Sequence, residues 1–441
     1  MAQVSDRNTK EGRTRKTPAS SRNDKRRSTN GSASRPSNKL ICPDEAIHLV
    51  LGEKLVRQTR AVPLTEACGM QLAEPITADR DFPAFPRAMM DGYAVRVSDA
   101  GRTINVIGEV AAGSEAPGSV ETESCYEIMT GAPCPPGTEA VVQNEHVRRD
   151  GKRVTLPGRI DAGQHIAPQG SECRRGEVVL QPGRTISPLG VAVIASCGRE
   201  SVRVIPRPRL AVITTGTELV STGESPGLAQ IRDSNGPMLV AMARDMGLQT
   251  PSHRHADDRI DSLLDALRQN AEADIVLLTG GVSAGNYDLV PKAIEDYGAT
   301  TIFHKVNQKP GKPLLMARKD EQLIFGLPGN PLASHFCFHR YVAAAVRQIE
   351  GKATDQQPLR GALIESVRRK PTRTHFVPAR AARDNKEVGR WTVRPVPGVS
   401  SADIFASCHA NCYVEVPSGG GLIDIGEVLS FTWIGNAPWP N

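Results

Sequence analysis

The stretch from Asp274 to Pro331 decides the fold, and it reads DIVLLTGGVSAGNYDLV (274–290), HKVNQKPGKPLLMA (304–317) and LIFGLPGNP (323–331). The apolar runs at 275–278 and 323–325 are short and lead into glycine-containing loops, as buried parallel strands do. In an open α/β sheet such loops gather outside the strand ends, where small ligands bind. We therefore predict a doubly wound α/β domain, with three loops at the ends of three strands in one layer.

The second loop holds two lysines on a stiff turn. Lys309 and Lys312 flank Pro310-Gly311, and Pro313 closes the segment. Proline fixes φ and glycine permits unusual φ values, so the turn is expected to be rigid and to bring backbone close to a ligand. Asp288, at the start of a predicted helix, adds a carboxylate. Together these groups indicate an anion site beside a metal site.

Length and composition indicate a soluble chain with several domains. The 441 residues are 39% hydrophobic and 23% charged. No apolar run approaches the roughly 18 residues that a membrane-spanning helix needs. The nine cysteines are odd in number and scattered, which fits reduced thiols better than a disulfide framework. We expect a cytoplasmic protein.

The net charge of +6 lies in the N-terminal segment. Residues 1–39 hold 11 Lys or Arg against 3 Asp or Glu, a charge of +8 that leaves −2 for the rest. Without aromatic residues the segment has too little apolar surface to offset the entropy of ordering, so we predict a disordered basic tail over 1–40. A solvated tail is favoured over a nucleic-acid arm, because no aromatic residues interleave with the charges.

Other parts of the chain show distinct patterns. Short alternating runs between 104 and 180 predict β structure, and Pro206 and Pro208 mark a boundary. Strand and helix patterns then alternate over about 145 residues, and β patterns return from Leu359. A helix predicted over 331–349 carries His335 and His339 four positions apart. Because the acidic residue of the HExxH pattern is missing, packing is favoured over metal binding.

Seven short motifs follow one another between Ile41 and about Ile434. They are MDGYAV (90–95), IMTGAP (128–133), TTGTELV (214–220), IRDSN (231–235), TGGVSAGNYD (279–288), KPGKP (309–313) and LPGNP (327–331). Taken alone, Asp91 and Thr130 would be ordinary turn residues. As an ordered set, the motifs resemble the molybdopterin molybdenumtransferases, the MoeA-like family that includes the enzymatic E domain of gephyrin.

The resemblance implies a multidomain α/β plus β protein. It implies an elongated N-terminal domain over 41–77 and 147–205, a β subdomain over 78–146, a molybdopterin-binding α/β domain over 206–355 and a β-barrel domain over 356–441. It also implies a homodimer whose active site lies between the α/β domain of one subunit and the N-terminal domains of the other. The implied partners are molybdopterin adenylyltransferase and apo-molybdoenzymes, with neither membrane nor nucleic acid.

The implied reaction inserts molybdate into adenylylated molybdopterin, forms molybdenum cofactor and releases AMP, with Mg²⁺. The resemblance assigns catalysis to Asp91, Thr130, Glu218, Asp288, Lys309 and Lys312. It assigns cofactor binding to Thr215, Gly216, Gly280, Gly281, Ser283, Gly285, Pro313, Pro328, Gly329, Asn330, Arg373 and Ser401. Magnesium is assigned to Glu218, Asp257, Asp288 and Glu172. The lysines suit a tetrahedral dianion, and the Gly280–Ser283 loop suits a phosphate held by backbone N–H groups.

The sequence departs from the family pattern at several positions. Ala88-Met89 stands where Ser-Ala is usual, and Ala333 and Pro378 replace polar residues of the molybdate pocket. These departures keep a second hypothesis open, a non-catalytic scaffold that binds molybdopterin. A third hypothesis is the related molybdopterin adenylyltransferase. The long flanks argue against it, because that enzyme needs only the α/β domain.

Overall fold

The computed structural model describes residues 40–55, 57–115, 118–248, 251–282, 289–354, 358–384, 387, 389–398 and 403–435. Of the predicted basic tail, residues 1–39 lie outside this set. Among the described residues, no helix is both long and apolar enough to cross a membrane. All nine cysteines are free thiols.

The N-terminal half is built from small β structures whose strands are mostly antiparallel. A three-stranded sheet has the order β1 (Arg60–Pro63), β13 (Ser201–Ile205), β2 (Gln71–Leu72). Helices α2 (Leu64–Ala67) and α3 (Pro188–Ser196) share a core with it, since Ala67 and Ile194 pack with Val62 and Val204. Two-stranded pairs join β3 (Ile76–Thr77) to β12 (Val178–Leu180) and β4 (Arg87–Ala88) to β11 (Ile166–Ala167).

A second N-terminal sheet has six strands in the order β8-β5-β7-β6-β10-β9. The strands are β5 (Gly92–Val95), β6 (Thr103–Val110), β7 (Ser124–Ile128), β8 (Ala140–Gln143), β9 (Arg148–Asp150) and β10 (Arg153–Thr155). Alternate residues of the strands point into two small cores, for example Tyr93 and Val95 into one and Ala94 into the other. Because β10 pairs with β6, the boundary expected after residue 146 falls inside this sheet.

The predicted α/β domain contains a six-stranded sheet in the order β17-β14-β18-β22-β21-β19. The strands are β14 (Leu210–Thr215), β17 (Ser252–Ala256), β18 (Ile275–Thr279), β19 (Thr300–His304), β21 (Leu315–Lys319) and β22 (Gln322–Leu327). β17, β14, β18 and β22 are parallel, as the apolar runs of β14, β18 and β22 predict, whereas β17 has the polar sequence SHRHA. β21 is antiparallel to both of its neighbours.

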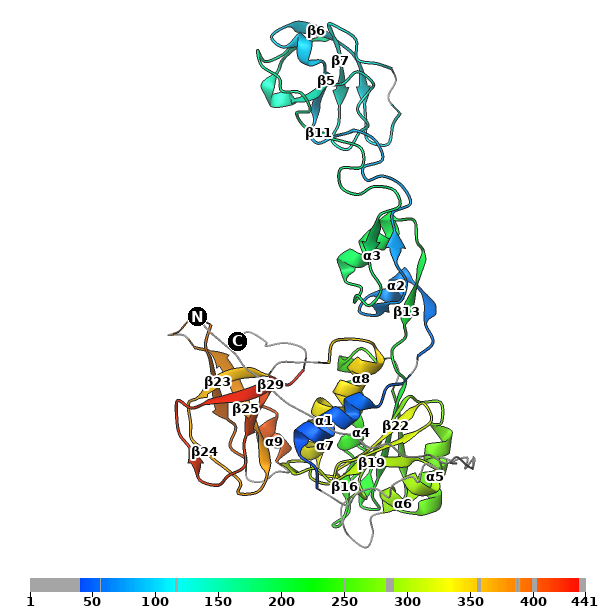
Figure 1. Ribbon diagram of the computed structural model, residues 1–441, viewed down its shortest axis with the longest axis vertical. Coiled ribbons are helices and arrows are strands. Elements are labelled where there is room, and N and C mark those ends of the chain that lie inside the picture. The colour runs from blue at the N-terminus through cyan, green and yellow to red at the C-terminus, as the bar shows by residue number, and fades with distance from the viewer. Residues whose placement is uncertain are drawn as a thin grey trace, which may run out of the picture. The chain divides into compact units, whose positions relative to one another are not determined.

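Helices cover both faces of this sheet (Figure 1). Val276 and Leu278 of β18 face α5 (Ile260–Gln269) and α6 (Leu289–Asp296). Ile275 and Leu277 face α1 (Pro43–Gly52), α4 (Asn235–Asp245), α7 (Pro331–Cys337) and α8 (Ala343–Ile349), with a π-helical turn at Phe338–Val342 between α7 and α8. Because helices cover both faces of the sheet, every residue of β18 is buried, which explains its continuous apolar run. The doubly wound fold is confirmed.

The KPGKP loop differs from the prediction that all three loops follow strands of one layer. The loop precedes β21. Its first residue, Lys309, belongs to β20 (Gln308–Lys309), which pairs with β25 (Thr374–Arg383) of the C-terminal sheet. Because β21 runs antiparallel to β22, Leu315 pairs with Gly326 near the end of β22. An antiparallel strand begins where its parallel neighbours end, so the loop still reaches the ligand edge.

The C-terminal sheet closes on itself, as a β-barrel requires. Its order is β20-β25-β26-β23-β29-β27, and β27 pairs back with β25. The additional strands are β23 (Leu359–Leu363), β26 (Trp391–Pro395), β27 (Cys412–Val416) and β29 (Val428–Trp433). Phe376 and Tyr413 of the barrel share the main α/β core with Phe336 of α7. The predicted barrel domain is confirmed.

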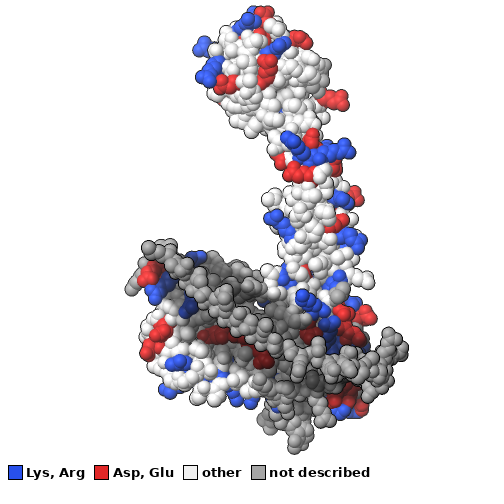
Figure 2. All heavy atoms as spheres, in the orientation of Figure 1, with Lys and Arg blue, Asp and Glu red and all other residues white. Residues whose placement is uncertain are grey.

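Charges of both signs are mixed on the face drawn in Figure 2, wherever it is not grey. The figure therefore shows no large single-sign patch on the visible described surface of this face.

Candidate active site

The turn after β14 is fixed by a carboxylate from the neighbouring strand's loop. The Thr215 hydroxyl donates to Asp258 Oδ1, and the Thr217 N–H donates to Asp258 Oδ2 at 3.0 Å. Gly216, inside this turn, has φ +152°, and a Cβ there would lie 2.7 Å from the Glu218 carboxylate. Glu218 itself is exposed. The turn therefore holds an exposed carboxylate beside a bare stretch of backbone.

The loops after β18 and β22 are packed against each other and against β14. A Cβ on Gly280 would lie 2.3 Å from the Thr215 carbonyl oxygen, and one on Gly329 would lie 3.6 Å from the Gly280 Cα. Asn235, only 8% exposed, donates to the Thr279 hydroxyl at 2.9 Å and to the Gly329 carbonyl at 2.8 Å. The turn after β14 and the loops after β18 and β22 thus lie close together at one edge of the sheet, and the latter two are among the three loops predicted to meet there.

The remaining glycine-loop residues serve the same edge. Gly281 has φ +57°, a conformation that favours glycine. The Thr279 hydroxyl donates to the Pro328 carbonyl at 3.2 Å. Asn330 caps α7, because its side-chain oxygen accepts from the Ala333 N–H at 3.3 Å. Asn330 therefore has a structural role in addition to the one assigned from the resemblance.

Buried side chains hold the KPGKP turn in place. Gln308 is fully buried, donates to the Gly311 carbonyl at 3.2 Å and accepts from the Tyr341 hydroxyl. Gly311 has φ +88°, and a Cβ there would lie 2.5 Å from Cys337 Sγ. The backbone N–H of Val306 donates to the Lys312 carbonyl at 2.8 Å. Pro313 is half-buried beside Lys312, so the turn cannot relax easily.

Three cations meet where β20 joins β25. Lys309 pairs in register with His375, and Lys370 and Arg373 lie close enough to act on it electrostatically. Burial, together with the positive charges of Lys370 and Arg373, lowers the pKa of Lys309. Burial, with the charges of Lys309 and Lys370, lowers the pKa of His375 to about 4. Cations that repel one another in a partly buried place are arranged to receive an anion.

Asp91 and Thr130 form a pair in the N-terminal six-stranded sheet. Asp91 Oδ1 accepts from the Thr130 hydroxyl at 2.6 Å and from the Thr130 N–H at 2.7 Å. The hydroxyl bond, and then the backbone bond, lower the pKa of Asp91. The two residues assigned from separate motifs are therefore brought together, and the carboxylate is exposed and ionised at neutral pH.

Of the four carboxylates assigned to magnesium, the structure describes Glu172, Glu218 and Asp257. Among the residues that the structure describes, no three His, Cys, Asp or Glu side chains form a metal site. Glu172 pairs with Arg87 at 2.8 Å. Glu218 and Asp257 are exposed and follow β14 and β17, whose ends Thr215 and Ala256 are in register. Ser283, Gly285, Asp288 and Ser401 lie outside the described residues.

Sequence reasoning missed three residues of this site. It chose Asp257, whereas the carboxylate that holds the Thr215 turn is its neighbour Asp258. Asn235 carried a signal, because it ends the IRDSN motif. Lys370 carried none, because its proximity to Lys309 depends on the pairing of β20 with β25.

Three family descriptions match successive parts of the chain. They are "MoeA N-terminal region (domain I and II)" over 41–198, "Probable molybdopterin binding domain" over 211–348 and "MoeA C-terminal region (domain IV)" over 360–433. The ranges match the β-rich first half, the doubly wound domain and the barrel, respectively.

Individual relatives cover nearly the whole chain. The molybdopterin molybdenumtransferase of Staphylococcus epidermidis is 32% identical over 400 residues, which are 87% of this chain and 95% of that one. The Staphylococcus aureus protein of the same name is 33% identical over 394 residues, or 87% and 93%. A crystal structure of the molybdopterin biosynthesis MoeA protein of Pyrococcus horikoshii has a TM-score of 0.75 at 26% identity, covering 90% of this chain and all of that one.

Sequence motifs, domain matches along the chain and a shared multidomain architecture therefore lead to one conclusion. The chain belongs to the MoeA-like family of molybdopterin molybdenumtransferases.

Proposed function

We propose that this transferase inserts molybdate into adenylylated molybdopterin and releases AMP. The observation that carries the proposal is the cation cluster of Lys309, Lys370 and Arg373 at the KPGKP turn, in a domain whose glycine loops pack together at one sheet edge. Lysine and arginine suit a small oxyanion such as molybdate. The bare backbone at Gly216, Gly280 and Gly329 suits close approach by the phosphate of a pterin substrate.

Magnesium fits as an ion shared with the substrate. Mg²⁺ is usually held by one or two carboxylates together with phosphate oxygens and water, so a protein-only site is not required. Glu218 and Asp257 are the described carboxylates that would hold it, since they follow neighbouring strand ends and are exposed. When bound there, Mg²⁺ would neutralise charge on the phosphoryl oxygens during anhydride cleavage. Glu172 fits less well, because Arg87 already pairs with it.

The chain's own residues suggest a division of labour. Lys309 with its two neighbouring cations would bind and orient molybdate, which lowers the repulsion among them. The loop N–H groups would orient the pterin phosphate. The ionised Asp91, held by Thr130, would act on the adenylate from the partner subunit of a homodimer, by positioning water or a metal-bound phosphate. We place this reaction in the cytoplasm, with the adenylyltransferase upstream and apo-molybdoenzymes downstream.

The decisive experiment measures AMP release by the purified chain from adenylylated molybdopterin with magnesium, with and without molybdate. Release that depends on molybdate is the expected result. Pterin binding without AMP release would favour the non-catalytic scaffold instead. That alternative is motivated by Ala333, which is buried, and Pro378, which lies in β25, at two pocket positions that are usually polar. ATP-dependent adenylylation of molybdopterin would favour the third hypothesis.

A further inference from the structure

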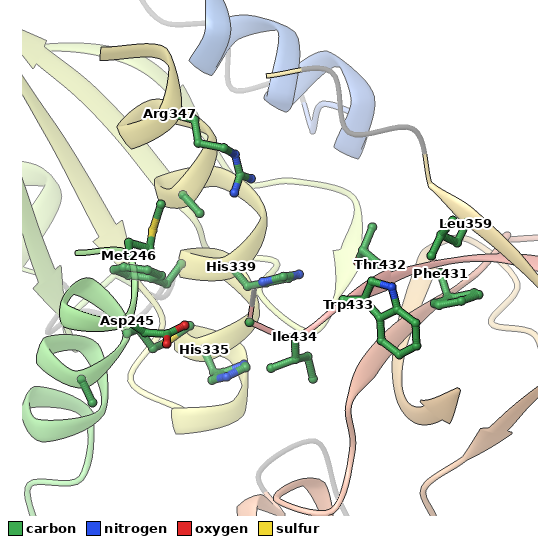
Figure 3. A pocket seen from close by; sticks show the side chains of 15 residues that line it. Asp245, Met246, His335, His339, Arg347, Leu359, Phe431, Thr432, Trp433 and Ile434 are labelled. Atoms are coloured by element: carbon green, nitrogen blue, oxygen red, sulfur yellow. The ribbon is translucent and has the colours of Figure 1, made fainter. Parts of the chain in front are cut away.

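A cavity of about 560 Å³ lies between α4, the α7–α8 helical run and β29 (Figure 3). This volume is within the range of small-molecule sites. None of the described residues assigned to the active site lines the cavity. The helices of the cavity share a core with Tyr413 of the barrel, and Ile434, directly after β29, packs against the same core.

The polar wall is a row on one helical run, made by His335, His339 and Arg347. In an unbroken α-helix a residue 12 positions on would point about 120° away, at 3.6 residues per turn. The π-helical turn at Phe338–Val342 adds one residue to a turn. The effective spacing becomes roughly 11, or three turns, and Arg347 returns to the face of His335. Such π turns occur frequently at functional sites.

The polar groups of this row have unused hydrogen-bonding capacity. His335 Nδ1 shares a hydrogen bond of 2.8 Å with the Tyr413 hydroxyl, which leaves Nε2. Within the described part of the chain, neither the Arg347 guanidinium nor the His339 ring has a hydrogen-bond partner, and Arg347 Nε is buried. Glu350, the acid nearest in sequence to Arg347, pairs with Lys352 at 2.9 Å. The Glu350 carboxylate also acts on Arg347 electrostatically, but in the described part of the chain no hydrogen bond joins the two, so the partly buried guanidinium can still donate to an incoming anion.

Arg347 is the one charged side chain of this row, while Asp245 of α4 places a carboxylate elsewhere in the lining of the cavity. Burial lowers the pKa of His335 to about 4. Burial, followed by the charges of His335, Arg347 and Arg340, lowers the pKa of His339 to about 3. Both imidazoles are therefore neutral at pH 7 and offer one donor and one acceptor each. A ligand with a single anionic group would match this wall better than a polyanion.

The facing wall is aromatic. Phe431 is buried, and Trp433 meets it edge to face with ring centroids 5.1 Å apart. Figure 3 shows Trp433, Phe431 and Leu359 on β29 and β23 opposite His339 and Arg347 on the helix. An aromatic wall across from a cation favours a ring that carries its charge at one end.

We propose that this cavity is a second ligand site for a small planar aromatic anion. Its carboxylate or phosphate is held by Arg347, and its ring lies against Trp433 and Phe431, with hydrogen bonds to the imidazoles. The site is separate from the molybdate site, and it stands whether or not the proposed insertion reaction is correct.

The test is calorimetric titration of the full chain with 1-naphthoate, 1-naphthyl phosphate and the neutral 1-naphthamide. At least one anion is expected to bind one to one with a Kd below about 1 mM, at least about tenfold more tightly than the amide. The anion that binds with the lower Kd shows whether the site prefers a carboxylate or a phosphate. Binding that is absent for both anions, or equal for the amide, would overturn the proposal.

Variants locate the bound probe. Arg347→Gln should weaken it at least about tenfold, and Ala241→Trp, which fills the rim from an exposed position of α4, should abolish it. Arg340→Gln is the matched control, because Arg340 lies on the same run but pairs with Asp44 at 3.1 Å and does not line the cavity. Saturating molybdate should not displace the probe. Displacement by molybdate, or binding only after deletion of residues 436–441, would refute the site.

Discussion

At the scale of single residues, Lys309 links the fold to an expected pH dependence. Burial and two neighbouring cations lower its pKa, so in the free protein it loses its proton at a lower pH than an ordinary lysine. Binding of an anion that needs the ammonium form should therefore weaken with rising pH earlier than usual for lysine. Arg373→Gln removes one repulsive charge and should raise the pKa of Lys309.

NMR titration of the Lys309 side chain in the free protein checks this prediction. The midpoint should rise in Arg373→Gln, and the alkaline limit of molybdate binding should move upward with it, even if affinity at neutral pH falls. Arg360→Gln, at the exposed start of the barrel, is a control that should leave the midpoint unchanged. An unchanged midpoint in Arg373→Gln would mean that the three cations do not interact as we describe.

Gly280 gives a sharper test of loop packing. Its φ is +105°, and a Cβ there would lie 2.3 Å from the Thr215 carbonyl oxygen. Gly298 also has positive φ, +87°, but a Cβ there would have no heavy-atom neighbour within 4 Å. Both alanine substitutions carry the backbone penalty of about 1–2 kcal/mol. Only Gly280→Ala adds a backbone clash.

Urea unfolding should therefore show a larger loss for Gly280→Ala than for Gly298→Ala, by at least about 2 kcal/mol. AMP release should fall in Gly280→Ala, because the loop must move away from β14 to admit the methyl group. Equal losses of unfolding free energy in the two variants would contradict the close packing of Gly280 against the Thr215 carbonyl.

At the scale of elements, the turn after β14 depends on the loop after β17. Asp258 accepts from the Thr215 hydroxyl and from the Thr217 N–H, and so positions Glu218 without being exposed like Asp257. Asp258→Ala should lower kcat for AMP release about tenfold or more, since two hydrogen bonds to a charged acceptor are lost. KM for the pterin substrate should change less.

Asp261→Ala is the matched control, because Asp261 is exposed in the first turn of α5. It should leave both kinetic constants unchanged. A purely structural role of Asp258 would lower the melting temperature while the surviving folded enzyme kept its kcat, and that result would contradict the positioning role.

Elements also show where reasoning from sequence succeeds and where it stops. The parallel strands β14, β18 and β22 were predictable, because strands buried on both faces are short apolar runs that end in glycine loops. The pairing of β20 with β25 was not, since it joins Lys309 to His375 across several strands and the α7–α8 helical run, a separation that local patterns do not describe. A hydrophobic period of 3.6 residues also does not predict the π-helical turn, which brings Arg347 to the face of His335.

One residue can decide a site in the same way. Asp257 and Asp258 are equivalent in a sequence pattern, but one position separates an exposed carboxylate from one that holds the Thr215 turn. The pair of Asp91 and Thr130 was predicted only through the resemblance, because turn chemistry alone explains each of them.

At the scale of the whole molecule, the chain returns to its α/β core from distant parts of the sequence. Ala46 and Val50 of α1, which precede the N-terminal sheets, are fully buried in the same core as Val346 of α8. The N-terminal sheets with Asp91 are thus inserted between α1 and β14. An insertion of this kind can carry a catalytic group to a second subunit while its own α/β domain stays intact.

The proposed homodimer makes this arrangement testable by mixing inactive subunits. Asp91→Ala and Lys309→Ala should each abolish molybdate-dependent AMP release while leaving the fold intact, because Asp91 is exposed and Lys309 is only half-buried. In a heterodimer of the two variants, one of the two shared sites contains both native residues. Random mixing should then restore roughly a quarter of native activity, because half of the dimers are mixed and each mixed dimer has one complete site. A mixture of Asp91→Ala with Thr130→Val is the control, since both changes fall in the same half-site and no complete site can form. Activity that stays absent in the first mixture, although subunit exchange is verified by mass, would place Asp91 and Lys309 in one subunit's site and refute the shared cleft.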